Sequence, residues 1–273
     1  MTSKVIKANQ FQASIIKFSD AIKINKYGGK TVYANYGGSP LRIQMPKMNI
    51  PFGVSKYQNP DKPEEIKYSL EMSFANLPEE ILSELKKMED IIIAFAEEKS
   101  KELFKKTQSK DLILEFYKSF IKYAESEDGE RNDKYAPRLK AKIYTDGKDF
   151  RVDAYEAEKV NGSYPKVYIT EDNVDEIIQK GGKCEAIIEC IGIWVVNKSF
   201  GVSWKLAQLK LHRNENQLAG YAFEDDVEDS GALKPGFESE ALESVLETDF
   251  GVLGIHEESP VKPKRKARES RDL

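Results

Sequence analysis

The sequence predicts a mainly β fold with a helical insertion (α+β), followed by a disordered C-terminal tail. Three observations indicate this. Short stretches of alternating apolar and polar residues, separated by turn residues, fill the chain to about Phe74. A block with helical periodicity then interrupts the strands, and two long strand-like stretches precede a charged C-terminal segment. We therefore expect one folded domain over residues 1–223, with the helical insertion at about 77–125, and a tail over 224–273.

The N-terminal region is predicted to form short strands because turn signals divide it. Turns rich in glycine, proline or asparagine are expected at 27–30, 36–40 and 59–63. The clearest strand covers residues 67–74, where every second residue is apolar: Tyr68, Leu70, Met72 and Phe74. One face of this strand should lie in the core and the other should face water.

The helical insertion is predicted from apolar residues that recur at spacings of three, four or twice four between positions 81 and 103. Asn76 is followed three residues later by Glu79, and Pro78 occupies the expected first turn, which is typical of a helix N-terminus. A second helix is expected from position 109 to about 123.

Strands resume after the insertion. We expect a hairpin in which a strand at 138–144 turns through Asp146 and Gly147 to a partner at 150–155, then a short helix at 170–180 and two long strands at 183–196 and 202–211. Parallel βαβ alternation is absent, so a doubly wound fold is excluded. The order suits an OB-like antiparallel β-barrel with the helices between its third and fourth strands, and a β-sandwich with an inserted helical hairpin is the alternative.

Residues for enzyme chemistry are scarce. The chain has two histidines, His212 and His256, and it has no HExxH, paired CxxC, P-loop or GxGxxG motif. Its many carboxylates lie in charge runs typical of solvated surfaces. We therefore expect no catalytic residues, no metal site and no cofactor, with a metal nuclease that uses carboxylates alone as the remaining enzymatic alternative.

The net charge of −4 is distributed unevenly along the chain. Residues 224–273 carry 7 basic and 14 acidic residues, which leaves 35 basic and 32 acidic residues in a mildly basic body. Such a division is typical of a protein whose tail competes with, or recruits partners to, a surface that binds polyanions. No run of about 20 apolar residues or apolar leader is visible, so we expect an intracellular, non-secreted protein without a membrane partner.

Basic residues alternate with aromatic residues on several predicted strands, a composition typical of proteins that bind single-stranded nucleic acid. Alternation from Arg138 to Tyr144 should place the basic residues of that strand on one outer face. A glycine-rich turn near the N-terminus and the loop of the last hairpin carry similar clusters. The predicted nucleic-acid-binding residues are Lys30, Tyr33, Tyr36, Arg42, Lys47, Lys134, Tyr135, Arg138, Lys140, Lys142, Tyr144, Trp194, Lys198 and Lys205.

Three segments resemble a known family. The segment 192–209, with a strand, a short loop, Gly-Val-Ser and a final strand containing glutamine, resembles the end of the OB-fold domain in podovirus-type phage single-stranded-DNA-binding proteins. Segments 39–54 and 134–137 resemble the related proteins of nucleocytoplasmic large DNA viruses, and the resemblance extends over most of residues 10–223. It implies an OB barrel that coats single-stranded DNA during replication and an acidic tail that contacts replication proteins.

The tail departs from that family. The phage proteins end on an acidic stretch with a terminal aromatic residue, whereas here a basic segment follows the acidic one. The resemblance implies partner binding by the acidic residues and the aromatic residue that closes them: Glu224, Asp225, Asp226, Glu228, Asp229, Asp249 and Phe250. The basic segment is predicted to act as a nuclear import signal or a second polyanion contact through Lys262, Lys264, Arg265, Lys266 and Arg268.

The sequence thus predicts a non-enzymatic protein that binds and coats single-stranded DNA with little sequence preference during replication or recombination. Replication proteins are the expected tail partners, and the host nucleus or a cytoplasmic viral replication site is the expected location. The alternative is a structural or scaffold protein, of a virion for example, with a β-rich domain that binds other proteins. Site size, preference for DNA over RNA and a homo-oligomeric state stay open.

Overall fold

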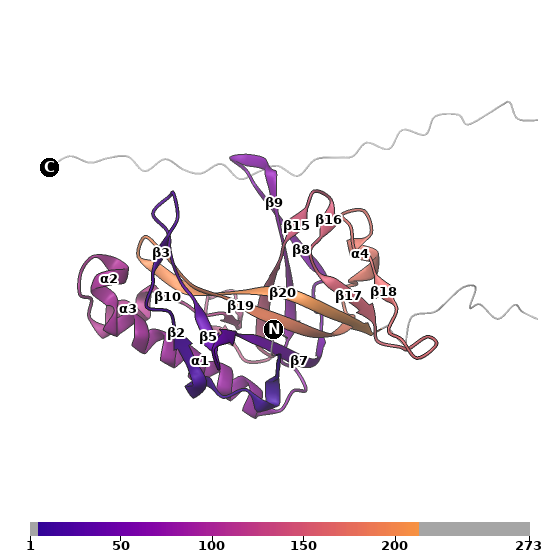
Figure 1. The fold of residues 1–273 in the computed structure, drawn as a ribbon, viewed down its shortest axis with the longest axis horizontal. Coiled ribbons are helices and arrows are strands. Elements are labelled where there is room, and N and C mark those ends of the chain that lie inside the picture. Colours follow the sequence, from indigo (N-terminus) through magenta and orange to yellow (C-terminus); the bar gives the residue numbers. More distant parts are fainter. Residues whose placement is uncertain (1–4, 213–273) are drawn as a thin grey trace, which may run out of the picture. The chain divides into compact units, whose positions relative to one another are not determined.

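The computed structural model describes residues 5–212 (Figure 1). The predicted tail, 224–273, lies outside the described residues. Within the described part the protein is mainly β with few helices, as the sequence predicts. None of the helices in residues 5–212 is long and apolar enough to span a membrane.

Five strands form a closed circuit of pairings. They are β7 (Arg42–Asn49), β9 (Lys62–Ser73), β14 (Arg138–Ile143), β19 (Lys183–Val196) and β20 (Ser199–His212). From β7 the pairings run to β9, β14, β20 and β19 and return to β7, and only the β14–β20 pair is parallel. The β7–β9 junction is narrow, since it consists of the single pair Asn49 and Ser73.

Other strands extend this circuit. In Figure 1 the β8–β9 and β3–β4 hairpins project to the same side of the β19–β20 ribbon. The strands paired to the circuit are β1 (Ile6–Lys7), β4 (Lys30–Val32), β8 (Val54–Asn59), β10 (Tyr117–Lys118), β11 (Ile121–Lys122) and β17 (Asp153–Glu156). Two more strands pair with these: β3 (Lys23–Ile24) with β4, and β18 (Lys166–Val167) with β17. Separate small sheets contain β2 (Ile16–Phe18), β5 (Ala34–Tyr36), β6 (Ser39–Pro40), β12 (Ala124–Glu125), β13 (Arg131–Asn132), β15 (Thr145–Asp146) and β16 (Asp149–Phe150).

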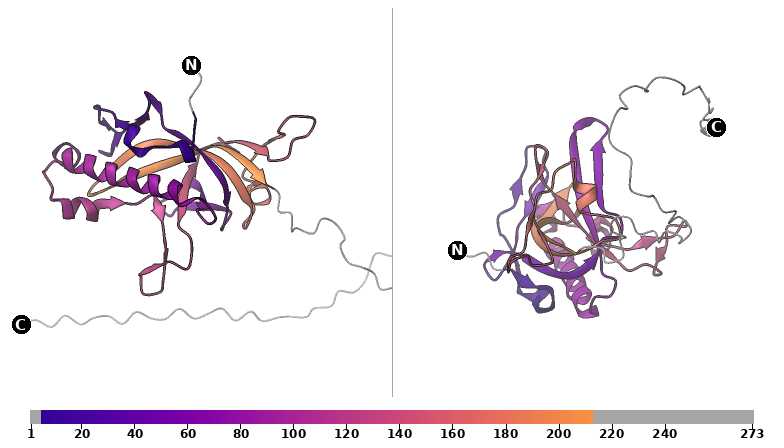
Figure 2. Two further views of the ribbon diagram at one scale, coloured as in Figure 1. Left: turned by 90° about the horizontal axis from the view of Figure 1, so that it is seen from below. Right: turned by 90° about the vertical axis from the view of Figure 1, so that its right-hand side faces the viewer.

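The helical insertion lies between β9 and β14 and contains α1 (Glu79–Glu98), α2 (Ser100–Phe104) and α3 (Lys110–Phe116). Figure 2 shows α1 running lengthwise against the strands, and its buried stripe is Ile81, Leu85, Met88, Ile92 and Ala96. The predicted place between third and fourth strands is wrong, because β9 and β14 are the second and third circuit strands in chain order. The second helix is shorter than predicted because the chain leaves α3 to pair β10 with β20.

The predicted hairpin of 138–144 with 150–155 is also wrong. Both edges of β14 are occupied, one by β9 and the other by β20, so no edge is left for the following strand. The Asp146-Gly147 turn closes only the short β15–β16 ribbon, and β17 pairs instead with β20 and β18. The helix predicted at 170–180 is reduced to α4 (Val174–Ile177).

Candidate nucleic-acid interface

Four lysines lie on the outer face of adjacent circuit strands. Residues paired directly across a sheet share a face. Lys142 on β14 is paired with Lys205 on β20 and with Ser69 on β9, and Lys67 and Lys140 lie on the same face by strand alternation. The opposite face of β14 is buried, through Leu139, Ala141 and Ile143. We call Lys67, Lys140, Lys142 and Lys205 the lysine face.

Three of the four lysines of the lysine face have no ion pair among the described residues, and the fourth has a long one. Lys67 and Lys205 have no ion pair among residues 5–212, and Lys140 Nζ reaches only 4.0 Å from Glu71 Oε1. Lys142 Nζ donates a hydrogen bond to Ser203 Oγ at 2.9 Å, a neutral partner. Partial burial, together with repulsion from Lys67 and Lys140, lowers the pKa of Lys142. Clustered like charges without a counter-charge destabilise the protein alone and favour an anionic ligand.

Two exposed tyrosines border the lysine face on one side. Tyr57 on β8 is paired with Lys67 and is 58% exposed. Tyr144 follows β14 with the same parity as Lys142 and is 43% exposed, and partial burial raises the pKa of its hydroxyl. Each ring therefore offers a face to a stacked base beside a cation.

On the other side, Trp194 and Tyr33 continue the same face. Trp194 on β19 is paired with Gly201 on β20 and with Thr31 on β4. A Cβ atom at Gly201 would lie 2.5 Å from the Lys118 carbonyl oxygen and 3.2 Å from the Trp194 ring, so glycine leaves room for both the β10 backbone and the indole. Tyr33 is 39% exposed, and Lys23 Nζ lies 4.7 Å from its ring centroid. We call Tyr33, Tyr57, Tyr144 and Trp194 the aromatic flanks.

A glycine at a β-bulge brings Tyr33 close to β19. The β19–β20 register shifts between Cys190 and Gly192. Gly192 has φ +128°, and a Cβ atom there would lie 2.4 Å from the Val32 carbonyl oxygen. Only glycine permits this close approach of β4 to β19, which holds Tyr33 beside the outer face.

Two predicted site residues have structural roles. Lys30 donates hydrogen bonds to the carbonyl oxygens of Glu102 and Leu103, at 2.8 Å for Leu103, so its ammonium group caps the end of α2. Tyr36 packs its ring 5.7 Å from that of Phe11, and its hydroxyl accepts a hydrogen bond from the Gln12 backbone. These contacts hold both side chains within the fold, and nucleic-acid binding by Lys30 and Tyr36 stays a prediction.

Arg138 and Arg42 reach the outer surface with their charges already paired. Arg138 Nε donates to Glu71 Oε2 at 2.9 Å, and its guanidinium lies 5.2 Å from the ring centroid of Phe52. Arg42 Nε donates to Glu189 Oε2 at 2.6 Å, across the β7–β19 pair.

Four other predicted residues are not tied to the lysine face by any contact among residues 5–212. Lys47 is exposed at an irregular part of β7, Lys134 and Tyr135 lie in the loop between β13 and β14, and Lys198 lies in the β19–β20 turn. They stay predictions.

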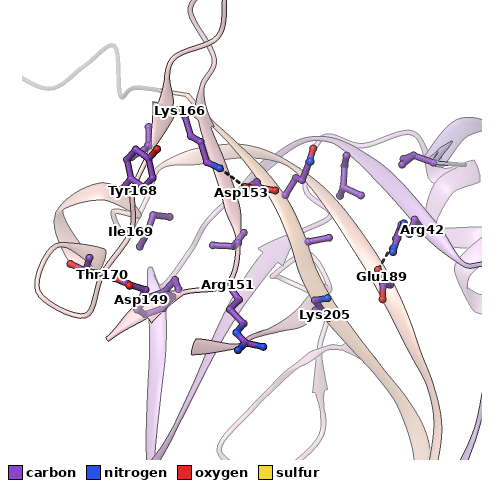
Figure 3. Close-up of a pocket in the computed structure, with 17 residues that line it drawn as sticks. Arg42, Asp149, Arg151, Asp153, Lys166, Tyr168, Ile169, Thr170, Glu189 and Lys205 are labelled. Atoms are coloured by element: carbon purple, nitrogen blue, oxygen red, sulfur yellow. Dashed lines mark hydrogen bonds and ion pairs between the residues drawn. The ribbon is translucent and has the colours of Figure 1, made fainter. Parts of the chain in front are cut away.

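A pocket of about 660 Å³ adjoins the lysine face at Lys205 (Figure 3). β17 and β18 form one wall and carry Asp153, Lys166 and Tyr168, while Arg42 and Glu189 form the other. The exposed side chain of Tyr168 lies at its rim. No group of metal-binding residues occurs among residues 5–212.

Sequence reasoning missed Tyr57, Lys67 and Tyr168. Lys67 could have been found, because the alternation that buries Tyr68 and Leu70 also places Lys67 on the wet face. Tyr57 and Tyr168 gave no comparable signal, since their positions depend on pairings that the sequence alone does not specify.

Part of the chain matches a protein family, and its fold is similar to solved structures. A family model described as "Family of unknown function (DUF5871)" matches residues 144–225, less than half of the chain. No curated protein matches. Among solved structures, the chain is similar to the single-stranded DNA-binding protein from bacteriophage Enc34 in complex with ssDNA, at 15% identity over 74% of this chain and 100% of that chain, with a TM-score of 0.36. It is also similar to gp2.5, a single-stranded DNA-binding protein encoded by bacteriophage T7, at 14% identity over 74% and 100% of the two chains, with a TM-score of 0.37. TM-scores this low carry no functional conclusion.

Proposed function

We propose that this protein binds and coats single-stranded DNA along the lysine face, with little sequence preference and without catalysing a reaction. The observation that carries the proposal is the set of un-neutralised lysines around Lys142, whose pKa is lowered by partial burial and by neighbouring lysines. A phosphate backbone would supply the missing counter-charges and release its own counterions, which is the main source of affinity in such complexes.

The aromatic flanks favour binding of single-stranded DNA over binding of duplex DNA. Tyr33, Tyr57, Tyr144 and Trp194 lie on both sides of the lysines, and bases are free to stack on aromatic rings only when they are unpaired. The lysines would then hold the backbone while the rings hold the bases.

The strand circuit supports an OB-like barrel as the scaffold. Its order, with one parallel pair between β14 and β20, closes five strands on themselves as in a small Greek-key barrel. OB-folds bind single strands across one sheet face and its bordering loops, and the lysine face and aromatic flanks have this arrangement.

The tail belongs to the proposal as a regulator. Its acidic residues, from Glu224 to Asp249, would compete with DNA or recruit replication proteins, and its basic end would serve as an import signal or a further DNA contact. The expected setting is replication or recombination, in a host nucleus or a cytoplasmic viral replication site.

The test is a binding titration of the full chain with a labelled oligonucleotide at several salt concentrations. We expect saturable binding of single-stranded DNA that weakens as salt rises, and weaker binding of a duplex of the same sequence. Absence of binding at low salt would refute the proposal and favour a scaffold protein that binds other proteins.

A further inference from the structure

We propose that the pocket beside Lys205 binds one guanine base of the bound strand, so that a largely sequence-tolerant interface contains one selective position. This inference rests on the proposed function. The pocket adjoins the lysine face because Lys205 belongs to both. Lys205 is paired with Glu189 across β19–β20, and Glu189 with Arg42 across β19–β7, so the Arg42 backbone lies two strand spacings, about 10 Å, from that of Lys205.

Apart from Lys205, the cations that line the pocket are each paired with a carboxylate, unlike most lysines of the lysine face. Arg42 is paired with Glu189 at 2.6 Å and Lys166 with Asp153 at 2.7 Å, as the dashed lines in Figure 3 show. Arg151 is paired with Asp146 at 2.6 Å. A phosphate would meet a carboxylate beside each of these cations, whereas a neutral base would meet donors and acceptors side by side.

The Arg42–Glu189 pair has unused hydrogen-bonding capacity. Arginine has five N–H donors, and Arg42 uses only Nε toward Glu189 Oε2. No described residue donates a hydrogen bond to Glu189 Oε1. The pair therefore presents several donors next to a carboxylate acceptor at the pocket wall.

Guanine matches this arrangement best among the four bases. Its O6 and N7 accept hydrogen bonds from arginine, and its N1–H and N2–H₂ groups donate to one carboxylate. Thymine has a single N–H donor and matches less well. The remaining lining fits a flat heterocycle, since Val152, Ile169 and Ile187 are apolar lining residues and Tyr168 provides an exposed ring at the rim.

The experiment compares two strands of about 15 nucleotides, a length that spans one OB-fold site. One strand is all thymine and the other carries a single central guanine. We expect the wild-type chain to bind the guanine-containing strand at least about 5-fold more tightly, the lower limit for a well-made bidentate contact.

Glu189→Gln removes the carboxylate but keeps the size of the side chain, and it should bring the ratio of the two Kd values close to one. Tyr168→Ala changes a 76% exposed residue and keeps the test informative if Glu189→Gln folds poorly. It should weaken the guanine-containing complex more than the thymine complex. Tyr27→Ala, at a residue 79% exposed in the β3–β4 turn, is the matched control and should leave the ratio unchanged.

The outcomes separate this inference from the proposed function. If both strands bind with salt-dependent affinity but the ratio is one, or survives both pocket variants, the pocket inference is overturned and the proposed function stands. If neither strand binds, both are overturned. Displacement of the guanine-containing strand by low concentrations of deoxyguanosine monophosphate, with the thymine strand still bound, would assign the pocket to free nucleotides and overturn the strand-reading inference.

Discussion

Arg138 and Lys142 lie on the same face of the same strand, four residues apart, yet their surroundings differ completely. At the Arg138 end, the guanidinium is paired with Glu71 and lies against Phe52, with 18% of its side chain exposed. At the Lys142 end, the neighbouring charges are Lys67, Lys140 and Lys205, and the one hydrogen-bond partner of Lys142 is a serine hydroxyl. The charge at one end of β14 is paired, whereas Lys142 at the other end has no ion pair among residues 5–212.

A basic strand face is therefore not a binding surface along its whole length. A cation that already has a carboxylate partner gains little from a phosphate, because the new contact replaces an existing one. A cation that has only other cations as neighbours gains the full free energy of its contact with a phosphate.

Replacing Lys67, Lys142 and Lys205 together by glutamine should cause the largest loss of affinity. Three phosphate contacts would be lost. Each should reduce the slope of log affinity against log salt concentration by roughly 0.7, so the slope should shrink by about 2. Between about 50 and 200 mM salt, the wild type would then lose about 20-fold more affinity than the variant. Circular dichroism and thermal melting serve as fold controls, and an unchanged slope in a folded variant would place the phosphate path elsewhere.

Truncating the aromatic flanks should have the next largest effect. Tyr57→Ala, Tyr33→Ala, Tyr144→Ala or Trp194→Ala should include at least one change that costs about 1–3 kcal/mol of binding free energy. Tyr36→Ala is the control, since that ring packs against Phe11 and its loss should lower the melting temperature rather than the affinity. Wild-type affinity in all four flank variants would show that bases do not stack on these rings.

Deleting residues 224–273 should raise affinity for single-stranded DNA a few-fold at low salt, because a tethered acidic segment acts as a competing polyanion. The gain should fade as salt screens both interactions. Deleting only 262–273 removes the basic end and should weaken binding or leave it unchanged. A loss of affinity at low salt after the full deletion would show that the tail contributes to binding instead.

The pH dependence should give a smaller effect with a defined sign. Lys142 loses its proton below the ordinary pKa of 10.5, so affinity should fall as pH rises through its lowered pKa. Between the lowered pKa and 10.5, Lys142 binds more protons in the unfolded chain than in the folded chain. Lys142 therefore makes the free energy of unfolding rise with pH in this range. Lys142→Arg stays charged and should flatten both trends. Parallel pH profiles of wild type and Lys142→Arg would contradict this assignment.

The sequence was sufficient to predict what depends on local alternation. The buried positions 139, 141 and 143 and the outward Lys140 and Lys142 follow from the period of a strand, and the structure has them so. The helical insertion was predicted for the same reason, since its apolar spacing is local.

What the sequence could not predict depends on long-range pairing. Glu71 is 67 residues away from Arg138, and only the β9–β14 register brings the two together. Lys30 similarly meets α2 carbonyl groups more than 70 residues away, so its glycine-rich surroundings in the sequence did not indicate this contact. Whether a cation is free to bind DNA depends on its partner within the protein, and the register of the strands determines that partner.

The most direct test of the contrast between the two ends of β14 is the salt dependence of single-stranded DNA binding by Lys142→Gln and Arg138→Gln, measured beside the wild type. We expect Lys142→Gln to lower the slope of log affinity against log salt concentration by about 0.7 and to leave the melting temperature close to that of the wild type. We expect Arg138→Gln to leave the slope unchanged and to lower the melting temperature, because Glu71 loses its closer ion-pair partner. A reduced slope for Arg138→Gln together with an unchanged slope for Lys142→Gln would contradict both expectations.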